Sequence, residues 1–219
     1  MSIQLHIPHP ILYEDEFIIV LNKPCSLMVE PDRNNHPNLL QQVKNYLKSS
    51  LKMREEVYAQ HIHRLDRPVS GIILFAKQRV VLKNLSEQFA ERKVKKEYQA
   101  LTVNAPSQRS GVLENWHRKE KKKAMISIGE LPYSEKAVLA YEVKPMNERF
   151  LWNIELHTGK YHQIRAQLAF IGCPIVGDQL YQSLVPYQPD SIALHACKLV
   201  FHHPVTNKEM IITSDKSFQ

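Results

Sequence analysis

The chain has 219 residues, 43% of them hydrophobic and 23% charged, which is typical of a globular protein with one domain or two small ones. Lysine and arginine exceed aspartate and glutamate by 29 to 22, and this net charge of +7 favours a polyanionic partner. Six glycines argue against a glycine-rich nucleotide loop, and three scattered cysteines argue against a disulfide framework or a thiolate zinc site. With neither a signal peptide nor a membrane-length apolar run, a cytoplasmic location is expected.

The first half of the chain predicts a β-hairpin, two helices and a strand. The hairpin covers residues 11–24, with its turn at three consecutive acidic residues. Leucine and valine at helical spacing after Asn38 predict a helix from residue 39, and a second apolar series predicts another over residues 78–93. Between them, residues 71–76 form a β-rich run.

Strands dominate the second half. Alternating or β-branched sequence predicts strands at residues 98–103, 138–143, 151–157, 193–201 and 209–213. One helix is predicted over residues 161–170. Strands outnumber helices without a regular β-α repeat, so the fold class is α+β, built on a largely antiparallel sheet.

Residues 91–123 carry nearly all of the net charge, with ten basic and four acidic side chains. A solvated surface loop explains this composition as well as a binding surface does. Tyr98 and Trp116 lie within the segment, and such a mixture of aromatic rings and cations suits single-stranded nucleic acid.

A second concentration of polar residues precedes the 71–76 run, in the sequence HIHRLDRPVSG from His61 to Gly71. Arg64 and Arg67 flank Asp66 and favour its ionised form, and an ionised carboxylate in a shaped loop can act as a nucleophile or stabilise charge. A structural turn, held by bonds from Asp66 to local amides, remains an alternative.

A metal site competes for the same segment, because His61, His63 and Asp66 loosely resemble a hydrolase zinc motif. The order departs from the metallo-β-lactamase pattern, and the interleaved arginines would repel a divalent ion. His202 and His203 are more simply explained as the end of a strand.

Cations also crowd the start of the predicted third helix, at Lys160, His162 and Arg165. Helix N-termini prefer acidic residues, so this conflict can mark a site in which Arg165 forms a bidentate pair with a carboxylate. An exposed basic face is the alternative. Residues 177–181 and 194–196 alone indicate only a turn and a strand.

Together these segments resemble the RluA-type pseudouridine synthase family, in order and over nearly the whole chain. The matching motifs are Asn22-Lys23-Pro24, His63-Arg64-Leu65-Asp66 with Ser70-Gly71, Lys96-Glu97-Tyr98, Thr158-Gly159 with His162-Gln163-Ile164-Arg165, Gly177-Asp178 with Tyr181, and Leu194-His195-Ala196. Val69 stands where the family usually has threonine, which puts one local hydrogen bond in doubt.

The resemblance implies an isomerase that converts uridine to pseudouridine in ribosomal or transfer RNA. It implies that Asp66 is the catalytic residue, that Tyr98 packs on the target base, and that Arg165 pairs with the catalytic carboxylate. Further substrate contacts are implied within the same motifs for His63, Arg64, Lys96, Lys160, His162 and Ile164.

The expected architecture is a mixed, largely antiparallel sheet with flanking helices and loops around a central catalytic cleft. We expect residues 1–219 to form a single catalytic domain without an N-terminal accessory RNA-binding domain. RNA is the expected partner, with no membrane, metal or organic cofactor, and the protein is expected to be a monomer. A non-catalytic RNA-binding module and a metal-dependent hydrolase are the alternative functions.

Overall fold

The computed structural model describes residues 9–33, 36–215 and 218. The chain divides into two compact units. The first contains the residues up to Val94 together with Leu199–Ser214, and the second contains Lys95–Lys198 and the residues from Asp215. Strand β10 (Leu194–His202) contributes residues to both units. Each unit is described by itself.

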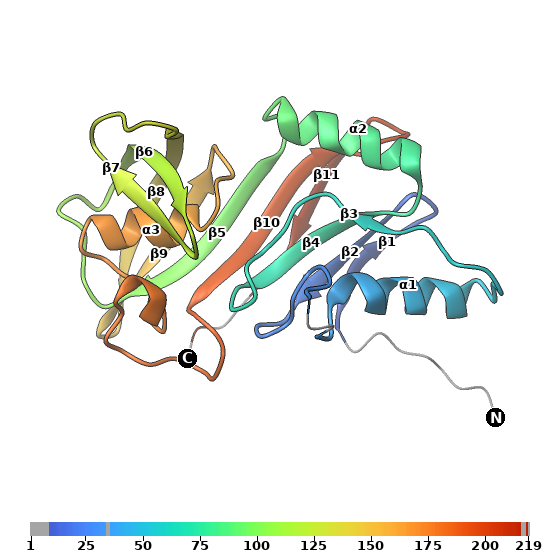
Figure 1. The fold of residues 1–219 in the computed structure, drawn as a ribbon, viewed down its shortest axis with the longest axis horizontal. Helices are drawn as coiled ribbons and strands as arrows, with labels where there is room; N and C mark the ends of the chain where they lie inside the picture. The colour runs from blue at the N-terminus through green and yellow to red at the C-terminus, as the bar shows by residue number, and fades with distance from the viewer. Residues whose placement is uncertain (1–8, 34–35, 216–217, 219) are drawn as a thin grey trace. The chain divides into compact units, whose positions relative to one another are not determined.

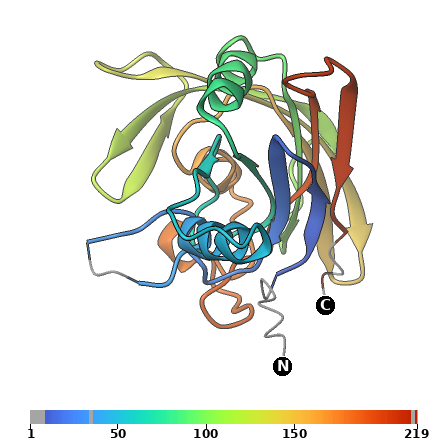
Figure 2. The same ribbon diagram turned by 90° about the vertical axis from the view of Figure 1, so that its right-hand side faces the viewer.

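The first unit is a curved sheet with two helices (Figure 1). Its elements are β1 (Ile11–Glu14), β2 (Ile18–Lys23), α1 (Leu39–Ser50), β3 (Gln60–His61), β4 (Ser70–Ala76), α2 (Arg79–Ala90) and β11 (Glu209–Thr213). Strands β1, β2 and β4 are neighbours, β3 also pairs with β4, and β11 pairs with β10. Strands β1 and β11, at the outer edges of this sheet, also contact each other. Figure 2 shows β1 and β2 (blue) beside β11 (red).

Alternate residues of the strands form the core of the first unit, as the two-residue period of a strand requires. Val81 and Leu85 of α2 join this core. Its strand members are Ile18, Val20, Ile72, Leu74, Ala76, Leu199, Phe201 and Ile212. Asn38 caps α1, because its side chain accepts a hydrogen bond from the Gln41 amide at 2.9 Å.

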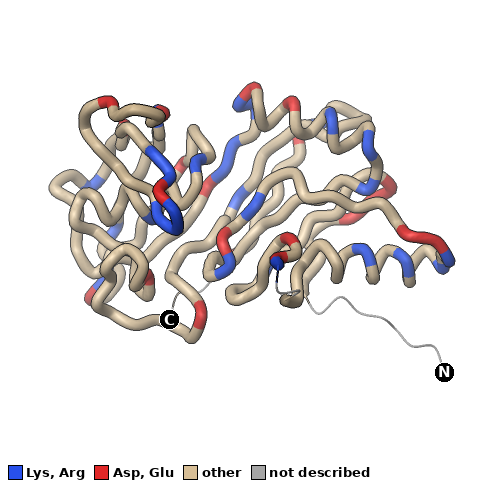
Figure 3. The backbone as a smooth tube through the Cα atoms, viewed as in Figure 1, with Lys and Arg blue, Asp and Glu red and all other residues tan. Residues whose placement is uncertain are grey.

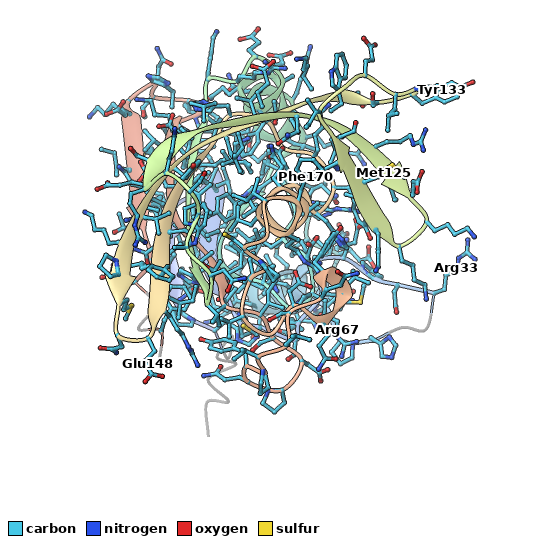
Figure 4. The ribbon with its side chains drawn as sticks, turned by 90° about the vertical axis from the view of Figure 1, so that its left-hand side faces the viewer. Arg33, Arg67, Met125, Tyr133, Glu148 and Phe170 are labelled. Atoms are coloured by element: carbon cyan, nitrogen blue, oxygen red, sulfur yellow. The ribbon has the colours of Figure 1, made fainter. Side chains whose placement is uncertain are left out.

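The second unit is an antiparallel sheet that carries one long hairpin and one short helix (Figure 1). Its elements are β5 (Lys95–Thr102), β6 (Ser110–Glu120), β7 (Lys123–Ser127), β8 (Glu135–Met146), β9 (Arg149–Leu156), α3 (Gln163–Phe170) and the 3₁₀ turn η1 (Gln179–Tyr181). The strand order is β5-β9-β8-β6-β7. In Figure 4, Met125 marks β7 and Phe170 marks the end of α3.

Most predicted elements are confirmed, and their bounds move by a few residues. The strand pairs β1–β2, β2–β4, β3–β4, β5–β9, β8–β9, β6–β8 and β6–β7 are all antiparallel. The α+β class with a largely antiparallel sheet is therefore confirmed. The expectation of one domain stays a prediction, beside the division of the chain into two compact units.

The sequence did not predict β6 and β7, which form a hairpin within and just beyond the basic segment. Glu120 pairs with Lys123, so the turn consists of Lys121 and Lys122, and Lys121 takes a left-handed φ of 48°. The third helix begins at Gln163, two residues later than predicted, because His162 has a left-handed φ of 52°. The alternative of a solvated loop is thus wrong for residues 110–120, which form a strand.

Candidate active site

Asp66 opens a tight turn that leads into β4. The Val69 amide donates to the Asp66 carbonyl at 3.0 Å, which places Arg67 and Pro68 at the centre of the turn. Leu65 and Val69 are buried on either side, whereas Arg67 is exposed. The buried neighbours therefore fix the turn to the first unit, and Asp66 has a defined backbone position.

Lys23 fastens this turn to the end of β2. Its side chain has 0% exposure, and its ammonium group donates to the carbonyls of Pro24 at 2.9 Å, Leu27 at 2.8 Å and Arg67 at 3.2 Å. A lysine ammonium offers three donors, and here they hold two separate loops together. The Asn22-Lys23-Pro24 motif thus acts on the loop that carries Asp66.

The two arginines beside Asp66 bind the 24–30 segment. Arg64 forms an ion pair with Glu30, and Arg67 Nε donates to the Ser26 carbonyl at 3.2 Å. Ser26 has a left-handed φ of 66°, so the receiving loop is itself sharply turned. The flanking arginines, expected to act on Asp66, therefore also tie its loop to the rest of the first unit.

The two histidines of this segment have separate environments. His63 Nε2 accepts a hydrogen bond from the Leu74 amide at 3.3 Å, and its ring stacks on Phe89 with centroids 5.2 Å apart. His61 Nε2 lies 3.3 Å from a Glu30 carboxylate oxygen, but neither ring nitrogen of His61 has a hydrogen-bond partner among the residues that the structure describes. Burial is the main reason that the pKa of His61 lies below its ordinary value.

The metal hypothesis finds little support in this geometry. His63 Nε2 accepts a hydrogen bond from a backbone amide, so this nitrogen has no lone pair left for a metal. Over residues 9–33, 36–215 and 218, no three histidine, cysteine, aspartate or glutamate side chains are grouped as metal ligands.

Tyr98 and Lys96 lie on β5 in the second unit. Tyr98 pairs with Ile154 of β9 and is 8% exposed. Lys96 is half-buried, and its ammonium lies 3.7 Å from the place that a side chain at Gly159 would occupy. Lys96 thus reaches the Thr158-Gly159 turn before α3, although 63 positions separate Lys96 from Gly159 in the sequence.

Helix α3 is fixed to the sheet by buried amides. Gln167 Nε2 donates to Asn115 Oδ1 at 2.8 Å and to the carbonyls of Leu113 and Ala137, both at 3.2 Å. Gln163 Nε2 donates to Gln167 Oε1 at 3.0 Å.

Gln163 also secures the turn that precedes the helix. Its Oε1 accepts from Thr158 Oγ1 at 2.8 Å and from the Lys160 amide at 3.0 Å. Because buried polar groups are costly unless they are satisfied, this network specifies one position for α3.

Arg165 forms the bidentate pair that the sequence predicted for it, with Asp178 as its carboxylate partner. Arg165 Nε donates to Asp178 Oδ2 at 2.7 Å, and Arg165 Nη2 donates to Oδ1 at 2.9 Å. The two side chains are 5% and 1% exposed. The pairing of Arg165 with Asp66, which the resemblance implies, stays a prediction.

Tyr181 covers the Arg165 guanidinium, whose carbon lies 5.2 Å from the ring centroid. The Tyr181 hydroxyl accepts from the Ala124 amide at 2.8 Å and lies 3.1 Å from His162 Nδ1. Burial raises the pKa of Tyr181 to about 12, so the hydroxyl keeps its proton at neutral pH. The hydroxyl can therefore donate a hydrogen bond to His162, which lies at the start of α3.

A stack of rings continues from His162 to the β6–β7 hairpin. Tyr161 stacks on His162 with centroids 3.8 Å apart, and the Lys119 ammonium lies 4.5 Å from the centroid of Tyr161. The Tyr161 hydroxyl donates to the Lys122 carbonyl at 3.3 Å. The lysine-rich hairpin is thereby attached to the start of α3.

The predicted site residues fall into two groups. His63, Arg64 and Asp66 share one loop of the first unit. The second unit holds Lys96, Tyr98, Lys160, His162, Ile164 and Arg165, with Ile164 buried and Lys160 paired with Glu135. Their roles stay predictions.

Sequence reasoning missed the contacts of Lys23, Glu30, Asp178 and the two glutamines of α3. The family motifs include Lys23, Gln163 and Asp178, and the 177–181 segment by itself predicted a turn, but no role was assigned to any of these three residues.

Comparison with known proteins identifies the family. The family model described as RNA pseudouridylate synthase matches residues 17–170. An uncharacterized RNA pseudouridine synthase of Aquifex aeolicus is 32% identical over 94% of this chain and 69% of its own length. The dual-specificity RNA pseudouridine synthase RluA of Escherichia coli is 30% identical over 95% of this chain and 93% of its own.

Two solved human structures share the fold. RNA pseudouridylate synthase domain containing 4 has a TM-score of 0.77 at 24% identity, covering 94% of this chain and 87% of its own. RNA pseudouridylate synthase domain containing 1 has a TM-score of 0.75 at 19% identity, covering 96% and 85%.

The chain therefore belongs to the RNA pseudouridine synthase family, a family of isomerases. Its similarity to the RluA proteins over almost the whole of both chains supports the RluA type within that family. In the part of the chain that the structure describes, no helix has the length and apolar character needed to cross a membrane.

Proposed function

We propose that this protein converts specific uridines of ribosomal or transfer RNA to pseudouridine in the cytoplasm, as a monomer, with Asp66 as the catalytic carboxylate. One observation carries the role of Asp66. The turn that it opens is anchored by the fully buried Lys23, which binds the carbonyl of Arg67, the next residue. Such anchoring suits a catalytic group, whose geometry must be fixed before the substrate arrives.

The reaction is an isomerisation that needs no change of oxidation state. The N-glycosidic bond breaks, the uracil turns, and C5 of the base joins the ribose carbon that N1 has left. C5 then loses its proton and N1 gains one, so the product is an isomer of the substrate. A carboxylate can assist by attacking the ribose, by adding to the base or by removing a ribose proton. Each route uses Asp66 without a metal or an organic cofactor.

The second unit supplies the proposed substrate contacts. Tyr98 would pack on the target base, and Arg165 would pair with the catalytic carboxylate. A base within a stem cannot be reached, so the target uridine must leave its stack, at a cost of about a few kcal/mol. Stacking on Tyr98 and contacts to phosphates offset this cost.

The β6–β7 hairpin is the proposed source of phosphate contacts. Lys119, Lys121, Lys122 and Lys123 are all exposed at or beside its turn, where Figure 3 shows the run of basic residues. Lys119 packs on Tyr161, and Tyr161 stacks on His162. A phosphate bound at the turn would therefore be held by a hairpin that contacts the start of α3.

The direct test is to map pseudouridine by carbodiimide-stop sequencing after incubation with total RNA from a strain that lacks the enzyme. The reaction is run with and without a chelator, and wild type is compared with Asp66→Ala. We expect modification at defined uridines with wild type and none with Asp66→Ala, which should fold and bind RNA normally. Glu56→Gln, a change at an exposed carboxylate, is the matched control and should remain active.

The outcomes separate the alternatives. Product from Asp66→Ala would overturn the role of that residue. RNA binding by wild type without any product would instead indicate a non-catalytic binding module, and activity abolished by the chelator would indicate a metal-dependent enzyme.

A further inference from the structure

The second unit contains a buried ion pair between Arg165 and Asp178. Both side chains are almost completely buried, and the guanidinium meets the carboxylate through two nitrogens on one edge. Replacing a buried ion pair by apolar residues often leaves stability unchanged or improves it, so such a pair is weak evidence for a purely stabilising role. Two parallel bonds do, however, fix the plane of a guanidinium in a way that one bond cannot.

The backbone around Asp178 is itself constrained. The Asp178 amide donates to the Ile175 carbonyl at 2.9 Å, and its carbonyl accepts from the amides of Tyr181 and Ser183, both at 3.0 Å. Gly177 has a left-handed φ of 87°, and a Cβ there would lie only 2.6 Å from Tyr187 Cβ. The carboxylate is therefore presented from a turn with little freedom to move.

The other faces of Arg165 are also held. Its backbone belongs to α3, which the two buried glutamines bond to the sheet. Its guanidinium lies over Tyr181, whose hydroxyl is fixed by the Ala124 amide. The helix α3, the Tyr181 ring and the Asp178 carboxylate thus define one orientation of the guanidinium. Among these three, the carboxylate is the group of opposite charge.

We propose that Asp178 is a positioning residue for the pseudouridine synthase reaction, holding the Arg165 guanidinium in the plane in which it serves the catalytic carboxylate. This inference rests on the proposed function, because it assumes that Arg165 takes part in the reaction. The pair engages Nε and Nη2 of the planar guanidinium, so fixing these two nitrogens also fixes the direction of Nη1. Asp178 acts through Arg165 and touches neither the substrate nor the reacting atoms.

The test is a double-mutant cycle between Asp178→Asn and Arg165→Lys, measured by single-turnover kinetics on a defined RNA. The amide introduced by Asp178→Asn can accept only one of the two bonds, and lysine is a point charge without the fork. A small misplacement of a catalytic group costs about 10²-fold in rate, so each single variant should lose about that factor in the chemical step. The Kd for RNA should change less than about threefold, because neither change removes an exposed contact.

The double variant decides between positioning and mere stabilisation. If Asp178 acts through Arg165, adding Asp178→Asn to Arg165→Lys should lower the rate no further. A structural role would instead lower the melting temperature and leave the rate of the folded fraction unchanged in both backgrounds. If Asp178→Asn does not fold, Asp178→Glu replaces it, because it keeps the charge and displaces the carboxylate by one methylene.

The outcomes also separate this inference from the proposed function. Loss of rate with Arg165→Lys but not with a folded Asp178 variant, or multiplication of the two effects in the double variant, would overturn the positioning role alone. An unchanged rate with Arg165→Lys would show that Arg165 itself has no part in the reaction.

Discussion

Lys23 has an ionisable side chain, yet it is fully buried. Burying an amine is costly unless its donors are satisfied, and the carbonyls of Pro24, Leu27 and Arg67 meet that requirement. Apolar residues surround it on β2 and β4, where it faces Gly71 across the strand pair. Its position therefore couples the stability of the first unit to the shape of the Asp66 turn.

Replacing Lys23 by Met should destabilise the protein by about 3 kcal/mol, because three partly buried carbonyls would lose their donor. Unfolding in urea measures this difference. Lys48→Met, at an exposed position in the last turn of α1, is the matched control and should change stability by less than about 0.5 kcal/mol. Equal effects from the two substitutions would show that the three hydrogen bonds of Lys23 contribute nothing.

Single residues were predictable only where chemistry is concentrated in a short segment. Asp66 stands out because two arginines, two histidines and a proline lie within a few positions of it. The need of Arg165 for a carboxylate was also readable, but its partner Asp178 was not. Thirteen positions and a loop separate the two, and no periodicity connects them.

At the scale of elements, the β6–β7 hairpin shows why a strand can be hidden in a basic sequence. The side chains of β6 that point inward include Asn115 and His117, which are buried but polar. Asn115 accepts a hydrogen bond from Gln167, and His117 Nε2 lies 2.8 Å from the Tyr161 carbonyl. Because the inner face binds α3 through hydrogen bonds, the apolar alternation that predicts strands is missing.

Where the inner faces are apolar, prediction succeeded. The first unit's strands β2 and β4 consist of nearly continuous buried isoleucine, valine and leucine, so their existence followed from composition. The start of α3 was predicted two residues early because helical periodicity does not register a left-handed residue such as His162. Its conformation became apparent only with the stacked ring of Tyr161 and the edge-on ring of Tyr181 beside it.

The hairpin yields a prediction about RNA binding. Changing Lys119, Lys121, Lys122 and Lys123 to Gln should weaken binding and reduce the slope of log K against log salt by about 2 to 3, since each lost phosphate contact removes about 0.7. Fluorescence anisotropy on a single-stranded target at several salt concentrations measures the slope.

A control with the same change of charge distinguishes local contact from net charge. Lys48, Lys52, Lys83 and Lys208 are exposed residues of the first unit, and their joint replacement by Gln also removes four positive charges. It should leave the slope nearly unchanged. A hairpin variant whose slope matches that of wild type would show that the hairpin lysines make no phosphate contacts.

At the scale of the whole molecule, the net charge of +7 resides mainly in one stretch of sequence, and the described structure distributes that stretch over both units. Arg92 and Lys93 follow α2 in the first unit, whereas the segment from Lys95 belongs to the second. Overall charge therefore predicted a polyanionic partner, and the structure places four exposed lysines of this stretch at or beside the β6–β7 turn.

Global stability should depend on pH through His61. Because burial lowers its pKa below the ordinary value of 6.5, the unfolded chain binds the proton more readily than the folded one. Stability from the neutral ring is fully present above pH 6.5 and is lost as the pH falls from 6.5 through the folded pKa. His61→Phe should therefore lose less unfolding free energy than wild type between about pH 7.5 and 5.5, as measured by urea titration.

His202→Asn is the control for that measurement, because His202 is exposed at the end of β10. Its stability should follow the pH dependence of wild type. If His61→Phe does so as well, the buried ring does not contribute to acid destabilisation.

The burial of Lys23 has a consequence for covalent labelling. Acylating reagents need an accessible amine, and they should modify the exposed hairpin lysines within the first moments of exposure. Lys23, with no exposed surface, can react only when the loops around it open. Peptide mass spectrometry would measure the delay between modification of the hairpin lysines and modification of Lys23. This delay reports how often the segment that carries Asp66 opens. RNA bound to this segment should lengthen the delay.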